Sequence, residues 1–384
     1  MPRSADIVII GGGCMGASVA YHLARRGMTR VVLLEREPML AAGSTGRNAG
    51  GVRHQFSNEA NIRLSLESIG LLERFADEVG HTIDFHQDGY LFLLSSQASV
   101  DTFRRNVALQ RSLGVDVEWL DAVEAARLVP GLDTSGVLGA TFCSRDGIAD
   151  PNGVTMGFAK AAQALGVTIE RDTDVTGIRV ERDRVVGVET TRGPIQTPCV
   201  VNAAGPWARQ IGTMAGVDVP VDPIRRHIFI AAFQPTARVP SSHVLVIDFE
   251  TTFYFHREGA GLLFGMGERG EAPTFDTTVQ WDFLPQVIDV AVKRLPSLGD
   301  ASISHAWAGL YDMSPDGNPI IGPARGLEGL FLINGFSGHG FQHSPAAGRL
   351  LADVITGRDP QFDLSTFAAG RFATGAVSGE RYVV

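Results

Sequence analysis

Lysine is nearly absent from this chain of 384 residues, since only Lys160 and Lys293 occur and almost all of the positive charge is arginine. The formal net charge is −9, and the densest basic spots are the pairs Arg25-Arg26 and Arg225-Arg226, which indicate helix ends or local sites. Nucleic-acid binding needs a basic face that neutralises phosphates. The charge balance therefore argues against DNA or RNA as a partner.

Cysteine and long apolar runs are scarce as well. Cys14, Cys143 and Cys199 are odd in number and lack metal-ligand spacing, so we expect neither a disulfide framework nor a metal site, and the pattern favours a cytoplasmic protein. No uninterrupted run of about 20 apolar residues occurs, so we expect no membrane span. Because single cores rarely exceed about 250 to 300 residues, the length indicates two domains or one large composite domain.

What the sequence does contain is a strand that runs straight into glycines. Residues 7–10 are followed by Gly11, Gly13 and Gly16, and a second apolar run ends in Glu35. Gly11 permits a tight turn, Gly13 lets the backbone approach a diphosphate, and Gly16 lets the next helix pack closely on the strand. Glu35 stands where a carboxylate accepts hydrogen bonds from ribose hydroxyls, so the sequence predicts a dinucleotide-binding βαβ unit for NAD, NADP or FAD.

Hydrophobic periodicity predicts a chain of mixed α and β structure. We expect helices at residues 17–27, 62–79 (one helix ending at Gly80), 100–129, 151–165 and 344–355. We expect strands at residues 90–94, 167–170, 175–180, 184–190, 200–202, 226–233, 243–256, 260–267 and 330–333. The middle strands have few helices between them and indicate an antiparallel sheet, whereas both ends of the chain contribute to the nucleotide fold.

Several segments occur in an order typical of one protein family. They are residues 11–16 with Glu35 and Arg36, the loop 43–54, and residues 146–151, 201–207 and 335–341. Together they resemble the D-amino-acid oxidase superfamily of flavoproteins, most of all its sarcosine oxidase and sarcosine oxidase β-subunit branch. The resemblance implies an α/β (α+β composite) fold in which a Rossmann-like FAD-binding domain (residues 1–85, 145–215 and 322–384) is joined to a substrate domain built on an antiparallel sheet (residues 86–144 and 216–321).

The resemblance also implies which residues bind FAD. They are Gly11, Gly13, Cys14, Met15, Gly16, Glu35, Arg36, Ser44, Thr45, Arg47, Asn48, Gly50, Gly51, Val52, Val175, Ala203, Ala204, Gly205, Trp207, Gly309, Gly335, Ser337, Gly338, His339, Gly340, Phe341 and Gln342. The helix after the last glycines would direct its partial positive charge at the reduced flavin ring. The alternative is that these glycines form a tight structural turn with a solvated histidine.

Candidate catalytic residues follow from the same resemblance. Arg53, followed by His54, resembles the arginine that holds a substrate carboxylate, for which a planar guanidinium is suited. Tyr254 and His256 alternate on one face of a predicted strand and are expected to line the pocket, and His339 lies in the last glycine turn. The alternatives are that Arg53 is tied to a core acid or to the flavin, and that Tyr254 and His256 only fill the sheet.

Departures from the family pattern concern the flavin and its electrons. Relatives that bind FAD covalently use a cysteine where Gly309-Leu310 stands, or a histidine where Arg47 stands, so we expect non-covalent FAD. Gln342 occupies the position of a second carboxylate-binding lysine, and Leu263 that of an oxygen-activating lysine. Rapid reaction with dioxygen is therefore not expected.

The function that these features imply is FAD-dependent oxidation of a small amine or amino acid, by hydride transfer to flavin N5 and hydrolysis of the imine. Substrates of the sarcosine, proline, glycine and D-amino-acid type fit this reading. One alternative is a 2-hydroxy-acid dehydrogenase. Another is a flavin-carrying subunit or assembly factor, whose partner would be a second subunit or an electron-acceptor protein.

Overall fold

A six-stranded sheet forms the first layer of the fold. The structure is a computed structural model that describes residues 3–234, 239–374 and 379–380. The strand order is β19-β20-β13-β1-β2-β9, in which only the edge strand β19 runs antiparallel to its neighbour. The strands are β1 (Ile7–Ile10), β2 (Val31–Leu34), β9 (Thr168–Glu170), β13 (Val200–Asn202), β19 (Ile320–Pro323) and β20 (Leu330–Asn334).

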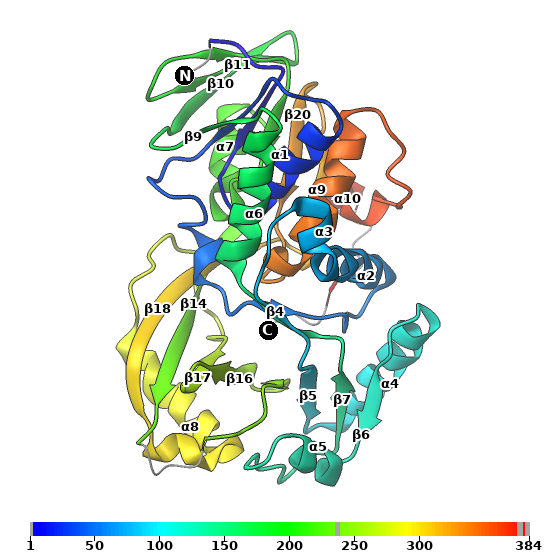
Figure 1. Ribbon diagram of the computed structural model, residues 1–384, viewed down its shortest axis with the longest axis vertical. Coiled ribbons are helices and arrows are strands. Elements are labelled where there is room, and N and C mark those ends of the chain that lie inside the picture. The colour runs from blue at the N-terminus through cyan, green and yellow to red at the C-terminus, as the bar shows by residue number, and fades with distance from the viewer. Residues whose placement is uncertain (1–2, 235–238, 375–378, 381–384) are drawn as a thin grey trace.

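Alternation along β1 sends its side chains into two cores. Ile7 and Ile9 pack against helices on one face, whereas Val8 and Ile10 pack on the other against a small sheet and helix α7. Figure 1 shows α1, α6 and α9 gathered over the first face. The elements are α1 (Cys14–Arg25), α2 (Glu59–Glu73), α3 (Phe75–Val79), α6 (Pro151–Ala164), α7 (Ala208–Met214), α9 (Gly340–Ile355), α10 (Arg371–Thr374), β10 (Val175–Glu181), β11 (Arg184–Thr190) and β12 (Ile195–Gln196).

An eight-stranded sheet forms the second body of the fold, in the lower half of Figure 1. Its order is β18-β14-β17-β16-β15-β5-β7-β6, and all pairs are antiparallel except β15 with β5. Helices α5 and α8 pack into the apolar core on one face, and the other face looks towards the nucleotide sheet. The elements are β5 (Tyr90–Leu94), β6 (Glu118–Leu120), β7 (Gly139–Cys143), β14 (Asp222–Ala232), β15 (Leu245–Asp248), β16 (Phe253–Glu258), β17 (Gly261–Met266), β18 (Ser302–Met313), α4 (Gln97–Ser112), α5 (Ala122–Leu128) and α8 (Leu284–Arg294).

A three-stranded sheet of order β3-β8-β4 lies between the two bodies. Strand β3 receives the glycine-rich loop and pairs with β8, so residues just after the loop are held at the junction. These strands are β3 (Gly51–Val52), β4 (Phe85–His86) and β8 (Gly147–Ala149). Short 3-10 helices are η1 (Ser44–Arg47), η2 (Gly205–Trp207), η3 (Trp281–Phe283), η4 (Pro296–Asp300) and η5 (Ser365–Phe367).

The predicted fold class is confirmed, and three predicted elements are wrong in detail. The helix expected up to Gly80 is two helices, because the chain turns at Arg74 (φ −106°, ψ 16°) and directs Phe75 into the core. The helix expected at 100–129 ends near Gly114 (φ +87°), after which β6 pairs with β7. The strand expected at 243–256 is a hairpin of β15 and β16 that turns at Thr252 (φ +60°). The domain ranges stay a prediction, and the boundary at 321/322 falls inside β19.

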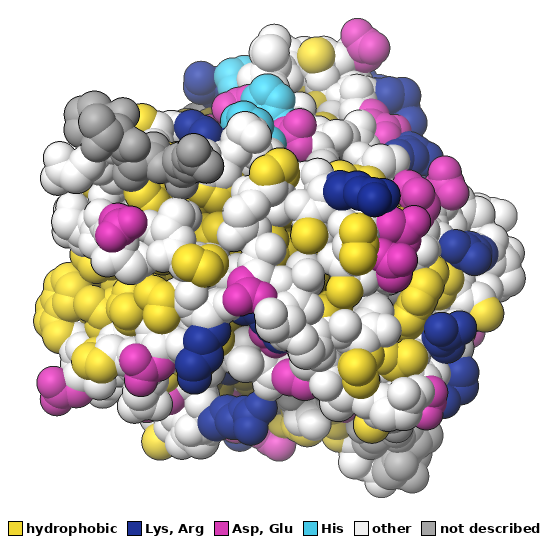
Figure 2. Space-filling view, turned by 90° about the horizontal axis from the view of Figure 1, so that it is seen from below, with side chains coloured by type: hydrophobic (Ala, Val, Ile, Leu, Met, Phe, Trp, Pro, Cys, Tyr) yellow, Lys and Arg dark blue, Asp and Glu magenta, His cyan; other side chains and the backbone are white. Residues whose placement is uncertain are grey.

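One face of the molecule agrees with the charge balance of the sequence. The face in Figure 2 carries acidic and basic side chains interspersed with apolar ones and no continuous basic area. Within the described ranges, no helix combines the length and the apolar character that crossing a membrane requires.

Helices α1 and α9 approach each other closely at Gly348. A Cβ added there would lie 2.2 Å from Ser18 Oγ and 2.9 Å from the Ser18 carbonyl carbon. We expect Gly348→Ala to lower the free energy of unfolding by about 1 to 3 kcal/mol, because the two helices must separate. Gly70→Ala is the matched control, since its Cβ would meet only the end of the Arg74 side chain at 3.4 Å, and it should stabilise by up to about 1 kcal/mol. Urea unfolding of both variants checks this; equal effects would contradict the packing.

Candidate active site

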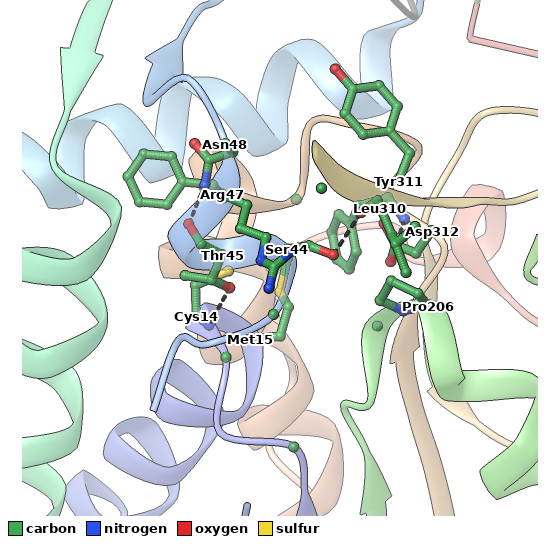
Figure 3. Close-up of a pocket in the computed structure, with 18 of the residues that line it drawn as sticks. Cys14, Met15, Ser44, Thr45, Arg47, Asn48, Pro206, Leu310, Tyr311 and Asp312 are labelled. Atoms are coloured by element: carbon green, nitrogen blue, oxygen red, sulfur yellow. Dashed lines mark hydrogen bonds between the residues drawn. The ribbon is translucent and has the colours of Figure 1, made fainter. Parts of the chain in front are cut away.

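A cavity of about 620 Å³ lies between the six-stranded and the eight-stranded sheet. Its walls come from the start of α1, the loop around η1, strand β18 and the turn before α9, several of which Figure 3 shows. The 3-10 helix η1 links the two sides, since Thr45 Oγ1 accepts from Cys14 N (3.1 Å) and Ser44 Oγ donates to the Leu310 carbonyl oxygen (2.6 Å).

One end of the cavity is the turn between β1 and α1. Gly11 has φ +113°, and a Cβ added there would lie 2.4 Å from the Ala203 carbonyl oxygen. A Cβ at Gly16 would lie 1.9 Å from the Gly11 carbonyl oxygen, so α1 packs directly on the end of β1. Gly13 caps α1 without a side-chain hydrogen bond, so this helix begins with backbone N–H groups at the cavity.

Glu35 and two aromatic rings border the same end. Glu35 Oε2 accepts from Gly12 N (2.7 Å) and Oε1 from Glu37 N (2.9 Å), so the carboxylate is held at the tip of β2. The guanidinium of Arg36 lies 3.9 Å above the Trp207 ring, and Trp207 stacks on Phe275 at 5.7 Å. All of these residues line the cavity.

Arg53 lies at the opposite end, largely buried. Its guanidinium carbon is 4.1 Å from the centre of the Phe56 ring, Nη1 donates to the Gln55 carbonyl oxygen, and its backbone N–H donates to Gln342 Oε1 (2.9 Å). The side chain lines the cavity, so the predicted arginine stands where a ligand can reach it.

His54 points away from the cavity into a buried polar cluster behind Arg53. Its Nδ1 lies 2.7 Å from Asp146 Oδ1, which also accepts from the His54 backbone N–H at 2.7 Å. Gln55 Nε2 donates to Asp146 Oδ2 at 3.0 Å, and Cys143 Sγ lies 4.0 Å from His54 Nδ1. The cluster brings together potential metal ligands that the sequence spacing gave no reason to group, and it holds the backbone on the C-terminal side of Arg53.

Of the two predicted residues on β16, only Tyr254 lines the cavity. His256 Nδ1 lies 2.7 Å from the Arg257 carbonyl oxygen, and the ring is buried beside the backbone of Ala49, outside the cavity lining. Tyr254 belongs to a set of three cavity tyrosines with Tyr90 and Tyr311. Burial raises the pKa of all three phenols, so they are protonated donors at neutral pH.

Each cavity tyrosine is seated against a glycine. A Cβ at Gly51 would lie 1.7 Å from Tyr90 Oη, and one at Gly265 would lie 2.5 Å from Tyr254 Oη. A Cβ at Gly338 would lie 2.3 Å from the Tyr311 ring. These contacts hold the three phenols in place at one end of the cavity.

His339 is the residue before α9 and lines the cavity. Neither ring nitrogen has a hydrogen-bond partner in the part of the chain that the structure describes. Burial, helped by the positive charge of Arg53, lowers the pKa of His339 to about 3, so the ring is neutral at physiological pH. His343 packs edge-on against it at 5.1 Å and lies 2.8 Å, Nε2 to Oγ, from Ser65.

Most residues predicted to bind the cofactor line this one cavity. They are Gly11, Gly13, Cys14, Met15, Glu35, Arg36, Ser44, Thr45, Arg47, Asn48, Gly51, Val175, Ala203, Ala204, Gly205, Trp207, Gly309, Ser337, Gly338, His339, Gly340, Phe341 and Gln342. The exceptions lie behind the wall and are Gly16, Gly50, Val52 and Gly335.

Sequence reasoning missed the wall that the eight-stranded sheet supplies. The cavity residues not predicted there are Tyr90, Arg226, Ile228, Leu245, Ile247, Leu310, Tyr311 and Asp312. Their strands are distant in sequence, and only the alternation within each strand could have indicated a shared face. Burial raises the pKa of Asp312 to about 6, although its Oδ2 accepts from the backbone N–H groups of Gly335 and Phe336.

The chain is similar in sequence to known flavin-dependent enzymes. The family model described as FAD dependent oxidoreductase matches residues 6–354. Human mitochondrial sarcosine dehydrogenase is 32% identical over 402 residues, covering 100% of this chain, and rat mitochondrial dimethylglycine dehydrogenase is 32% identical over 386 residues, covering 96%. The chain spans only 43% and 45% of the length of these two relatives.

Solved structures resemble the whole chain. The L-proline dehydrogenase from P. horikoshii superposes with a TM-score of 0.91 at 35% identity, covering 98% of this chain and 100% of that one. The glycine oxidase from Geobacillus kaustophilus superposes with a TM-score of 0.85 at 26% identity, covering 95% and 98%.

The neutral state of His339 implies that this residue affects how the free energy of unfolding depends on pH. A histidine with a lowered pKa in the folded state binds its proton more tightly once unfolded, so its contribution to stability is lost as the pH falls through about 6.5. Between pH 7 and pH 5, we expect the free energy of unfolding to fall by about 2 kcal/mol less in the His339→Gln variant than in the wild type. Urea titrations with flavin at one fixed concentration measure this, with the exposed His305→Gln as control. Equal pH dependence in His339→Gln and the wild type would contradict it.

Proposed function

We propose that this chain, which belongs to the FAD dependent oxidoreductase family, oxidises the C–N bond of a small amine or amino acid. One observation carries the proposal: a buried guanidinium, that of Arg53, lies in the same cavity as the uncapped start of α9 and three protonated phenols. The names of the relatives, which include dehydrogenases and oxidases of sarcosine, dimethylglycine, proline and glycine, support the same substrate class.

FAD fits the residues at the β1–α1 end. Bare glycine backbone and the uncapped N-terminus of α1 suit a diphosphate, because a helix N-terminus combines free N–H groups with partial positive charge. We assign ribose binding to Glu35, and we assign contact with the cofactor to the other predicted residues that line the cavity. Gly16, Gly50, Val52 and Gly335 shape this wall from behind.

When bound, FAD supplies a two-electron acceptor for the hydride of the substrate carbon. The chain itself contributes charge and position. Helix α9 directs its N-terminus into the cavity, so negative charge at this end is stabilised by the helix, and His339, which stays neutral, adds no positive charge of its own.

Arg53 orients the substrate. Its planar guanidinium can donate two parallel hydrogen bonds to a carboxylate. The cluster around Asp146 holds the backbone next to Arg53 in place. Burial favours the neutral form of a bound amine, which must lose its proton before oxidation. Protonated Tyr254 donates or accepts at the amine, and the imine product is hydrolysed by water.

We propose that a second protein accepts the electrons from the reduced flavin. Gln342 stands where a basic residue was expected, and it accepts from the Arg53 backbone instead of presenting a charge. Leu263 is buried in β17, and its side chain is not part of the cavity wall. With no lysine at either position, we propose slow reaction with dioxygen and electron transfer to a second subunit or an acceptor protein. We also propose a cytoplasmic location, on the cysteine usage alone, although two relatives are named mitochondrial.

Flavin bleaching under nitrogen tests the reaction. Sarcosine, proline, glycine or a D-amino acid should reduce the flavin. Arg53→Met should lower the rate constant of flavin reduction divided by the substrate dissociation constant (kred/Kd) by at least about 100-fold, because the pair between the guanidinium and the substrate carboxylate is lost. Arg63→Met, which removes an exposed arginine of α2, is the control and should change nothing. Reduction by 2-hydroxy acids alone would overturn the amine assignment.

The attachment of the flavin has its own test. Arg47 Nη1 is occupied by the Ala308 carbonyl oxygen at 2.9 Å, and Gly309 packs against the Arg47 side chain, so neither position offers a nucleophile. Acid precipitation should therefore release yellow colour into the supernatant. Colour retained in the pellet would show a covalent link.

A further inference from the structure

A second guanidinium faces the substrate end of the cavity. Arg225 and Arg226 are neighbours on β14, so their side chains leave the sheet on opposite faces. Arg225 is buried and ion-paired, with Nη2 at 2.8 Å from Glu271 and Nη1 at 3.0 Å from Asp276. Arg226 instead lines the cavity, two residues before Ile228, which also lines it.

Among the described residues, no carboxylate forms a salt bridge with Arg226. Its Nη1 donates to the Arg225 carbonyl oxygen (2.9 Å), its guanidinium carbon lies 5.1 Å from the centre of the Tyr311 ring, and its buried Nε has no hydrogen-bond partner among the described residues. The nearby acid Glu268 hydrogen-bonds to Glu271, which raises the pKa of Glu268, and the charges of Arg225 and Arg226 act on it in the opposite direction without a direct ion pair to Arg226. A half-buried cation without an anion is costly, so the site favours an anionic ligand.

Arg53 and Arg226 share the cavity with the three tyrosines. The positive charges of Arg53 and Arg226 both act to lower the pKa of the Tyr311 phenol. The charge of Arg53 acts to lower the pKa of Tyr90, and the charge of Arg226 acts to lower the pKa of Tyr254. Tyr311 lines the same cavity as both arginines and lies within the electrostatic range of each, and the glycine contacts hold all three phenols in place. A ligand in this part of the cavity can therefore contact both cations.

We propose that Arg226 binds a second carboxylate, so that the substrate class is an amine that carries two carboxylates. The proposal rests on the proposed amine oxidation and on Arg53 as the site of the first carboxylate. A planar carboxylate matches the guanidinium fork, and the aliphatic walls of Ile228, Leu245 and Ile247 suit a short carbon spacer.

Two matched pairs of probes test the proposal on the FAD-loaded protein. Sarcosine and iminodiacetate are secondary amines that differ by one carboxylate. Methoxyacetate and oxydiacetate are their ether counterparts, which bind without being oxidised. Anaerobic flavin reduction follows the amines, and perturbation of the flavin absorbance follows the ethers.

We expect the dicarboxylates to bind at least tenfold more tightly than the monocarboxylates. Arg226→Met should bring that ratio close to 1, because it removes a charge-assisted hydrogen bond worth about 10- to 100-fold, and Arg226→Lys should retain part of the ratio. Arg63→Met should leave the ratio unchanged. Circular dichroism and flavin content show that each variant is folded and loaded.

The outcomes separate this inference from the proposed function. If neither amine reduces the flavin but oxydiacetate still binds in an Arg226-dependent way, amine oxidation fails and the dicarboxylate site stands. If sarcosine reduces the flavin and the dicarboxylates bind no better, or if Arg226→Met leaves the ratio unchanged, the inference is overturned. Loss of flavin from Arg226→Met and Arg226→Lys would likewise overturn it, by making Arg226 a cofactor contact.

Discussion

The close approach of Gly16 to the carbonyl oxygen of Gly11 is the contact on which the site depends. It seats α1 on the end of β1, so that the uncapped start of the helix faces the cavity. Helix α9 then packs on α1 where Gly348 meets Ser18, and this places His339 and the start of α9 at the same cavity. Two helix N-termini thus converge because two glycines leave no side chain between the packed elements.

Burial then determines the charge of each group in the cavity. It keeps His339 neutral and the three tyrosines protonated, and it raises the pKa of Asp312 to about 6. The cations that persist there are arginines, whose guanidinium keeps its charge where a lysine would tend to lose it. The near absence of lysine in the chain agrees with a cavity whose positive charge must survive partial desolvation.

Local signals predicted most of the nucleotide half. Glycines after an apolar run indicated the β1–α1 turn, and most residues of the ordered motifs meet in one cavity. Prediction failed where a tertiary contact overrode periodicity: the apolar pattern continues through Arg74, yet the chain breaks there to bury Phe75. His54 and His256 were grouped with the cavity by position in sequence, but His54 pairs with a buried aspartate and His256 with the carbonyl oxygen of the next residue, and neither side chain lines the cavity.

The sequence by itself determined the flavoprotein family, the glycine cradle and the candidate arginine at residue 53, because each depends on residues that are close in the chain or ordered along it. Only the tertiary structure decided that Asp146 supports the backbone beside Arg53, and that Arg226 shares the cavity with it. Strand pairing across long separations joins β14 to β18 and β5 to β15, and no local pattern specifies which strands become neighbours.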